Sequence, residues 1–402
     1  MSMPKMLSVM ALVLAGSATY ACSDDSSRGT PAPTPTADGG VDGSPGDPDG
    51  GPVAKKNGFQ FTVSGEDLAI NGYDFGADPK ANGDPPAFVD GWEVKFEHVI
   101  VTVDKIRLNA DPDKDPANPD MQGPVVASVD GPWAVDVSIG GDVLGKSGSP
   151  DEKTVTIATI DAKSDGTAFD PAQRYAFNYD VVSATASAKL VNLDAAGKAL
   201  YETAKTNGWS MIYQGTATYK GAAPAVGSVF EKIPKEVKFT LGMKNPSSYI
   251  NCQNTDLQEI AAGEFPRGLQ ASADKVTVAQ ITIHTDHSFW SKLNVEGTEL
   301  HFDPIAARAS TYGTVGAASG TVTLDDLVNV DVTGFKTKND EVLPARSVVS
   351  DYTAPAGQLA FDSNGTSFTK ANSYAAYLQY SASSGGHLNA DGPCKVKNNY
   401  TP

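Results

Sequence analysis

From Gly58 onward the chain consists largely of short segments in which apolar and polar residues alternate, rich in Val, Ile, Thr, Tyr and Phe. A period of two places successive side chains on opposite faces of an extended backbone, so this pattern predicts half-buried β-strands. Strands are expected at residues 59–63, 92–108, 125–129, 133–139, 153–160, 175–190, 210–219, 236–241, 275–284, 320–324, 331–337 and 346–350. The stretch 92–108 is too long for one regular strand, and a bulge or bend is expected near His98.

Three stretches have helical character: 194–206, 254–262 and 367–381. The first has Asn192 or Asp194 as a candidate N-cap and Gly208 as a stop signal. Strands and helices do not alternate regularly, and no repeat recurs at a fixed period. We therefore predict a mostly β protein, an antiparallel β-sandwich in two lobes with one to three short helices.

A boundary between the lobes is expected at 221–227, where the composition turns to Gly, Ala and Pro. It would separate an N-terminal β-rich domain at 58–220 from a C-terminal β-rich domain at 228–402, and the second contains four of the five histidines.

The N-terminus has the order of a secretory signal: Lys5, an apolar run from Met6 to Gly16, and small residues before Cys22. Residues 1–21 are therefore predicted to be a signal peptide. The arrangement resembles a bacterial lipoprotein signal, which implies that the Cys22 thiol receives a diacylglycerol. Thr19 stands where such signals usually have Leu, so ordinary signal-peptidase cleavage after Ala21 is the alternative.

Residues 22–57 are made almost wholly of Ser, Asp, Gly, Pro, Thr and Ala. Such a composition cannot bury an apolar core, so this acidic linker is expected to be a disordered tether. The lipid anchor would make the membrane a partner, and Ser23 after the cysteine resembles sorting to the outer membrane. We expect a cell-envelope lipoprotein, facing the periplasm or exposed on the surface.

The charge balance excludes one class of partner. The net charge is −17, from 31 Lys and Arg against 48 Asp and Glu, and no basic cluster is present. Binding to nucleic acid depends on clustered Lys and Arg that neutralise phosphates. We therefore expect no nucleic-acid partner, while no motif specifies a protein or small-molecule partner.

Two cysteines remain once Cys22 is assigned to lipid, Cys252 and Cys394. A single pair in an oxidising compartment is expected to form one disulfide. It would close a loop of about 140 residues and contribute on the order of 4 to 5 kcal/mol in the chain-entropy model. The bridge would also hold the C-terminus against the start of the second half.

Histidine is scarce and unevenly placed, because only His98 lies outside the last 120 or so residues. Neutral imidazole is a favoured ligand of zinc and copper, and carboxylates complete such sites or orient the imidazoles. His301 is expected on the strand after His284 and His287, paired back across a hairpin. The candidate ligands for copper or zinc are His284, His287, His301, His387, Asp286, Asp303 and Asp391. The alternative is that these histidines are structural and bond to their neighbours.

Two segments resemble a known family. The sequence from Val63 to Tyr73, VSGEDLAINGY, and the later Gly386-His387-Leu388 with Gly392 and Cys394 are similar to periplasmic copper-binding lipoproteins found beside di-haem peroxidases. The resemblance implies two β-sandwich lobes and a copper site of histidines near a modified tryptophan, for which Trp290 is the local candidate. Asn71 stands where that family has a cysteine.

These observations favour a non-enzymatic lipoprotein that binds a ligand, with copper or zinc held by the second-half histidines. One alternative is a metal-free interaction or adhesion module of the cell surface. A metal-dependent hydrolase is a third hypothesis, and such an enzyme would need an open coordination position beside a general base.

Overall fold

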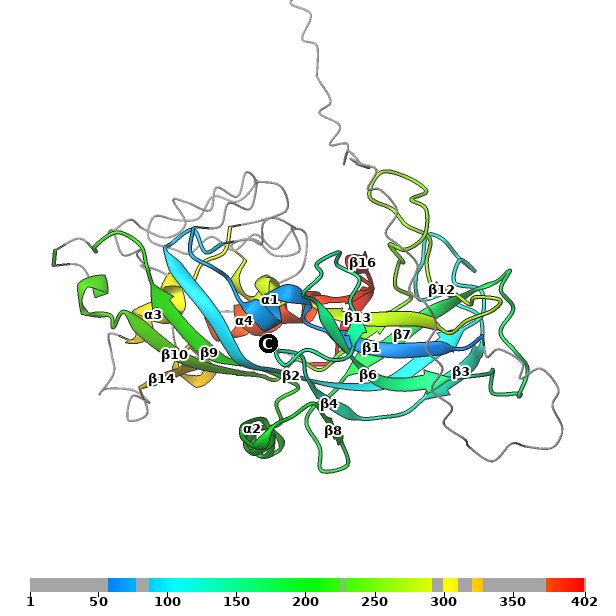
Figure 1. The fold of residues 1–402 in the computed structure, drawn as a ribbon, viewed down its shortest axis with the longest axis horizontal. Helices are drawn as coiled ribbons and strands as arrows, with labels where there is room; N and C mark the ends of the chain where they lie inside the picture. Colours follow the sequence, from blue (N-terminus) through cyan, green and yellow to red (C-terminus); the bar gives the residue numbers. More distant parts are fainter. Residues whose placement is uncertain are drawn as a thin grey trace, which may run out of the picture. The chain divides into compact units, whose positions relative to one another are not determined.

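Two β-sheets make up most of the regular structure (Figure 1). The computed structural model describes residues 57–76, 87–224, 226–227, 229–290, 299–309, 320–327 and 374–400. The first sheet contains, in spatial order, β16 (Gly392–Pro393), β15 (Gly386–Leu388), β13 (Thr277–Ile283), β1 (Phe59–Ser64), β6 (Lys153–Ile160) and β5 (Val143–Leu144).

The second sheet is larger. It contains, in spatial order, β14 (Thr321–Thr323), β10 (Glu236–Met243), β9 (Met211–Tyr219), β2 (Trp92–Asn109), β7 (Arg174–Val181), β11 (Ser247–Ile250) and β17 (Lys395–Asn398). Four short strands attach at its sides: β3 (Val125–Val129), β4 (Trp133–Asp136), β8 (Lys189–Val191) and β12 (Leu269–Gln270). Most neighbours are antiparallel, while β1 with β13, β10 with β14 and β4 with β8 are parallel. The predicted mostly β fold is confirmed.

The two sheets share one core. The apolar residues Phe59, Phe61 and Val63 lie on one face of β1 and are fully buried, and Thr62 and Ser64 on its other face are buried as well. The ring of Phe61 stacks on that of Phe177 in β7 at 5.9 Å, so side chains of the two sheets interdigitate. Burial of each such phenylalanine contributes roughly 1.5 to 3 kcal/mol.

The long strand β2 organises the second sheet. Its first part, Trp92 to Val101, pairs with β9, and its second part, Val103 to Asn109, pairs with β7. The register shifts between Phe96 and His98, which confirms the predicted bulge. The extra residue lets the chain continue as a single strand of 18 residues.

The predicted helix at 194–206 is α2 (Ala195–Asn207). Its N-cap Asp194 accepts a hydrogen bond from the Gly197 amide at 2.7 Å, and Gly208 ends it in the left-handed conformation. Three others are α1 (Glu66–Asn71), α3 (Asp303–Ala309) and α4 (Tyr374–Ser384), with 3₁₀ turns η1 (Val229–Lys232), η2 (Asp286–Phe289) and η4 (Leu324–Leu327). None of the helices among the described residues is long and apolar enough to cross a membrane.

Several expectations are corrected. Residues 254–262 form turns, because the Asn254 side chain accepts the Asp256 amide at 3.0 Å and so competes with a helix. The strand expected at 175–190 ends at Val181, and a separate strand begins at Lys189. His301 is not on a strand, since Leu300 makes only isolated bridges, to Phe88 and to Trp290, and α3 follows at once.

The expected strands at 331–337 and 346–350 lie outside the described residues, as does the first part of the expected helix at 367–381. Residues 54–402 group as one unit. Both sheets draw strands from either side of the expected boundary at 221–227: β1 pairs with β13, and β9 pairs with β10.

The disulfide between Cys252 and Cys394 is present, with a sequence separation of 142 residues. Cys252 is fully buried and follows β11, while Cys394 lies between β16 and β17. The bond therefore ties the segment between β16 and β17 to the end of β11 in the second sheet.

We predict that replacing both Cys252 and Cys394 by Ser lowers the free energy of unfolding by about 5 kcal/mol, because the unfolded chain regains the entropy of a 142-residue loop. Guanidinium unfolding curves of the variant and the wild type provide the measurement. Reduced wild-type protein is the control and should unfold like the variant. Equal midpoints for oxidised wild type and variant would contradict the prediction.

Candidate metal centre

Three histidines meet beside the end of β13. His284 directly follows β13, and His287 lies in η2 one turn later. His387 lies at the middle of β15, which pairs with β13 so that His387 is opposite Thr282. Two local histidines are thereby joined by a third that is about 100 residues away in the chain.

Two glycines allow β15 to lie close to its neighbours. The His284 amide donates to the Gly385 carbonyl at 2.8 Å, and a Cβ at Gly385 would lie only 2.7 Å from the His284 carbonyl oxygen. A Cβ at Gly386 would lie 2.2 Å from the ring of Tyr249. A larger residue at Gly385 would force β15 away from His284, and one at Gly386 would force β15 away from β11 of the second sheet.

The three imidazoles lie close to one another. The centroid of His284 lies 4.5 Å from that of His387 and 5.4 Å from that of His287, and the last two are 5.5 Å apart. All three residues are at least nine-tenths buried. Such a group of buried imidazoles costs solvation unless other polar groups or an ion compensate.

Carboxylates surround this histidine cluster, defined as His284, His287 and His387. Glu66 Oε2 lies 3.3 Å from His284 Nδ1, and Asp391 Oδ1 lies 3.8 Å from His284 Nε2. Asp286 comes from η2, next to His287 in sequence.

Two triads of possible ligand atoms result, and His284 belongs to both. His284, His387 and Asp391 form one, and His284, Asp286 and His287 form the other, with ligand atoms within 4.8 Å of one another in each. Two nitrogens and one carboxylate oxygen make a suitable donor set for zinc or copper.

The charge of His284 is set by its carboxylate neighbours. Burial alone would lower the pKa of its imidazole, but Glu66, Asp286 and Asp391 outweigh burial and raise the pKa to about 10. The protonated ring places Nδ1 toward Glu66, while Nε2 lies 3.2 Å from the Ala390 carbonyl oxygen. An arriving cation must therefore displace a proton from this ring.

His287 and His387 behave in the opposite way. Burial lowers the pKa of both imidazoles well below the usual value, and the charged His284 lowers it further. Both rings are neutral at pH 7, the state in which imidazole binds a metal.

Two buried polar atoms at the cluster lack a hydrogen-bond partner among the described residues. They are His387 Nδ1 and Asp286 Oδ1. The other oxygen of Asp286 accepts from the indole Nε1 of Trp290 at 2.9 Å. Because buried polar atoms are normally paired, each of these two atoms, one in either triad, would be stabilised by a cation that binds it.

Trp290 forms one wall of the cluster. Its ring stacks on His287 with centroids 3.6 Å apart, and it is 2% exposed. The hydroxyl of Tyr377 in α4 donates to the Trp290 carbonyl, and the hydroxyl of Ser381 donates to the His287 carbonyl. Helix α4 thus fixes η2, and the tryptophan is placed to report any change at His287.

The predicted ligands separate into two groups. His284, His287, His387, Asp286 and Asp391 lie together. His301 and Asp303 are in neither triad, although the His301 amide donates to the Phe289 carbonyl just after His287.

The side chains of His301 and Asp303 face different partners. His301 Nε2 lies 3.4 Å from Glu299 and Nδ1 lies 3.9 Å from Asp90. Asp303 accepts from the indole of Trp92 at 2.9 Å and begins α3.

His98 also lies elsewhere. Its Nδ1 is 2.6 Å from Asp136 Oδ2, and its Nε2 is 3.9 Å from Asp194, the N-cap of α2. The buried pair of His98 and Asp136 links β2 to β4, and His98 also faces the start of α2.

Glu66 is the residue that the sequence analysis of the site did not find. It begins α1 at a φ of 57°, and its amide donates to Ser64 Oγ at 2.8 Å. The segment VSGEDLAINGY was noted for its resemblance, yet nothing in it indicated contact with a histidine more than 200 residues away. Only the parallel pairing of β1 with β13 places α1 beside His284.

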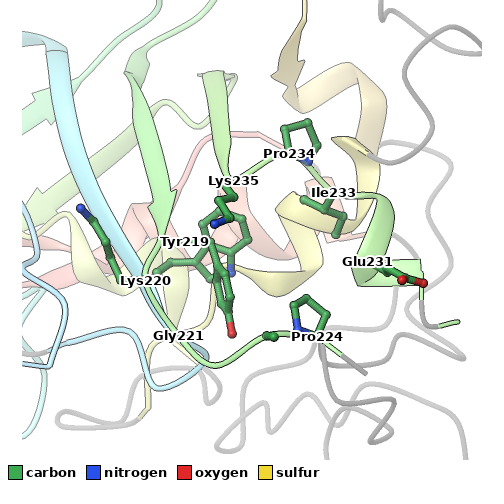
Figure 2. A pocket seen from close by; sticks show the side chains of 10 residues that line it. Tyr219, Lys220, Gly221, Pro224, Glu231, Ile233, Pro234 and Lys235 are labelled. Carbon is green, nitrogen blue, oxygen red and sulfur yellow. The ribbon is translucent and has the colours of Figure 1, made fainter. Parts of the chain in front are cut away.

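A separate cavity of about 350 Å³ lies where β2 begins and β9 ends (Figure 2). Trp92 and Tyr219 pack edge to face there at 5.2 Å, with Lys235 and Ile233 beside them. None of its lining residues is a histidine, so this cavity does not extend the histidine cluster.

Comparisons with protein-family models, curated proteins and solved structures found no match.

We predict that Glu66→Gln lowers the pKa of His284 from about 10, because Glu66 is the carboxylate that raises it most. Titration of the imidazole protons by NMR in metal-free protein measures this. Asp67→Asn, which removes the same charge from the next position of α1, is the control and should leave the pKa of His284 in place. An unchanged value in the Glu66 variant would refute the assigned cause.

We also predict that the stability of the metal-free protein falls as the pH drops below about 6.5. The folded state keeps His387 neutral because its pKa is lowered, whereas the unfolded chain binds a proton there. The unfolded state then binds more protons, so each such histidine costs about 1.4 kcal/mol per pH unit. Urea unfolding at pH 7.0 and 5.5 should give a smaller pH effect in His387→Asn than in wild type, and equal effects would contradict this.

Proposed function

We propose that this protein binds one Cu²⁺ or Zn²⁺ ion at the histidine cluster and holds it without catalysing a reaction. The observation that carries the proposal is the convergence of His284, His287 and His387, with a buried carboxylate oxygen and a buried imidazole nitrogen that lack hydrogen-bond partners among the described residues. An ion supplies the missing interaction for such atoms.

The donor set favours these divalent ions. Imidazole and carboxylate suit Zn²⁺ and Cu²⁺, whereas Cu⁺ prefers thiolate and thioether ligands. Neither triad contains a cysteine or a methionine. Each triad supplies three ligands, and water would complete a four-coordinate ion.

Glu66 would act on the ion through His284. When a metal binds the Nε2 side of His284, the Nδ1 proton can remain directed at Glu66, 3.3 Å away. A carboxylate behind a ligating imidazole fixes the orientation of the ring and raises its basicity.

The burial of the cluster supports binding of an ion rather than catalysis. His284 and His387 are each 7% exposed, and His287 is 2% exposed. Asp391 is the exposed member of the ligand set, whereas a hydrolase needs an open coordination position that substrate can reach beside a general base. The similarity of two segments to copper-binding lipoproteins points the same way.

We also propose that the protein is located in the cell envelope. The signal at residues 1–21, Cys22 and the acidic linker at 22–57 support export and anchoring to a membrane through lipid. A tethered ion-binding unit in the cell envelope meets copper or zinc before either enters the cytoplasm.

We predict that the metal-free full-length chain binds about one equivalent of Cu²⁺ or Zn²⁺ in calorimetric titration, and that copper quenches the fluorescence of Trp290. His284→Ala should weaken binding by more than the roughly 10- to 100-fold that loss of an outer-shell partner costs. His301→Gln, a buried histidine outside both triads, is the matched control and should bind like wild type.

Circular dichroism of each variant in the near ultraviolet establishes that it remains folded. No saturable binding by the wild type, or equal affinity in the His284 and His301 variants, would overturn the proposal.

A further inference from the structure

The two triads differ in their access to solvent. The Asp391 side chain is 74% exposed, while Asp286 has one oxygen buried with no hydrogen-bond partner among the described residues. We call His284, His387 and Asp391 the outer triad, and His284, Asp286 and His287 the inner triad. His387 and His287 are both buried. The pair of triads therefore forms a short path from the surface to the interior, with His284 common to both.

The outer triad is held in place by a rigid turn. Asp391 lies in the turn between β15 and β16, and Asn389 in the same turn is fully buried. The Asn389 amide donates to the Gln280 carbonyl at 2.7 Å, and its side chain donates to Asn254 Oδ1 at 2.6 Å. The disulfide at Cys394 follows three residues after Asp391. The backbone of Asp391 is thus fixed while its carboxylate remains accessible.

The inner triad offers the stronger binding position. A buried carboxylate oxygen without a hydrogen bond gains more from a cation than a solvated one does, because electrostatic interactions are less screened away from water. Asp286 supplies such an oxygen, and Asp391 does not. Helix α4 holds the inner residues through Ser381, which donates to the His287 carbonyl.

We propose that a divalent ion is captured at the outer triad of His284, His387 and Asp391 and then passes to the inner triad of His284, Asp286 and His287. This inference rests on the proposed function. The ion keeps His284 as a ligand throughout, exchanging His387 and Asp391 for His287 and Asp286. The one covalent bond that breaks is the N–H at the His284 nitrogen that binds the ion, whose proton passes to solvent, and water leaves the hydration shell of the ion.

The experiment uses the full-length chain with Zn²⁺ as the probe. Stopped-flow mixing with a fluorescent zinc indicator gives the loading rate, and equilibrium titration gives the stoichiometry. Because the chain has only five histidines, ¹⁵N-imidazole NMR of the zinc-loaded protein identifies the nitrogens that bind. The variants are Asp391→Asn and His287→Ala, with Asp274→Asn as a control. Asp274 is an exposed carboxylate in the turn before β13, at the other end of that strand from His284.

We expect Asp391→Asn to slow loading about tenfold, within the range by which charge steers association, while stoichiometry stays at one. Asp274→Asn should load at the wild-type rate. In the zinc-loaded wild type, ring nitrogens of His284 and His287 should shift and those of His387 should not. In His287→Ala the ion should stop at the outer triad, so that His387 now shifts and the added Asp391→Asn change abolishes binding.

Three results would overturn the inference while leaving the proposed function intact. They are two zinc ions per chain, an unchanged loading rate in Asp391→Asn, and a shift of His387 rather than His287 in the loaded wild type. Absence of zinc binding in the wild type would instead refute the proposed function itself, so the two failures are distinguishable.

Discussion

The antiparallel pairing of β15 with β13 is the constraint on which the candidate site depends. It places His387 opposite Thr282 and therefore beside His284. The pairing requires the glycine at position 385, because any side chain there would meet the His284 carbonyl. The disulfide at Cys394 and the buried Asn389 hold the same hairpin from its other side. Without this contact the cluster would lack His387, and the triad of His284, His387 and Asp391 could not form.

Charge compensation makes the buried cluster tolerable. Three imidazoles and an aspartate in a space shielded from water would be costly if all were ionised and unpaired. The protein resolves this by concentrating positive charge on His284, whose pKa Glu66 and two aspartates raise, and by keeping His287 and His387 neutral. The result is one charged ring beside two neutral ones. A divalent cation that displaces the proton of the charged ring would keep positive charge at the same place.

The alternation of apolar residues predicted most of the strands because burial of one face is a local property of a two-residue period. It also indicated the bulge near His98, since a strand of that length must bend. The expectations for 254–262 and for His301 failed because contacts of single residues decided them. The Asn254 side chain accepts a hydrogen bond from a nearby backbone amide, and the two bridges of Leu300 are isolated and do not extend into a strand. Neither contact leaves a periodic signal in the sequence.

The sequence by itself determined the mostly β class, the disulfide partners and the local pair His284 and His287, because periodicity, cysteine count and short spacing are all properties of the chain alone. Only the tertiary structure decided which distant residues complete the cluster. It brought in His387 and Glu66 through strand pairing at long range and left His301 outside. The physical reason is that register between strands far apart in the chain is set by packing of the whole sheet, and no short segment encodes it.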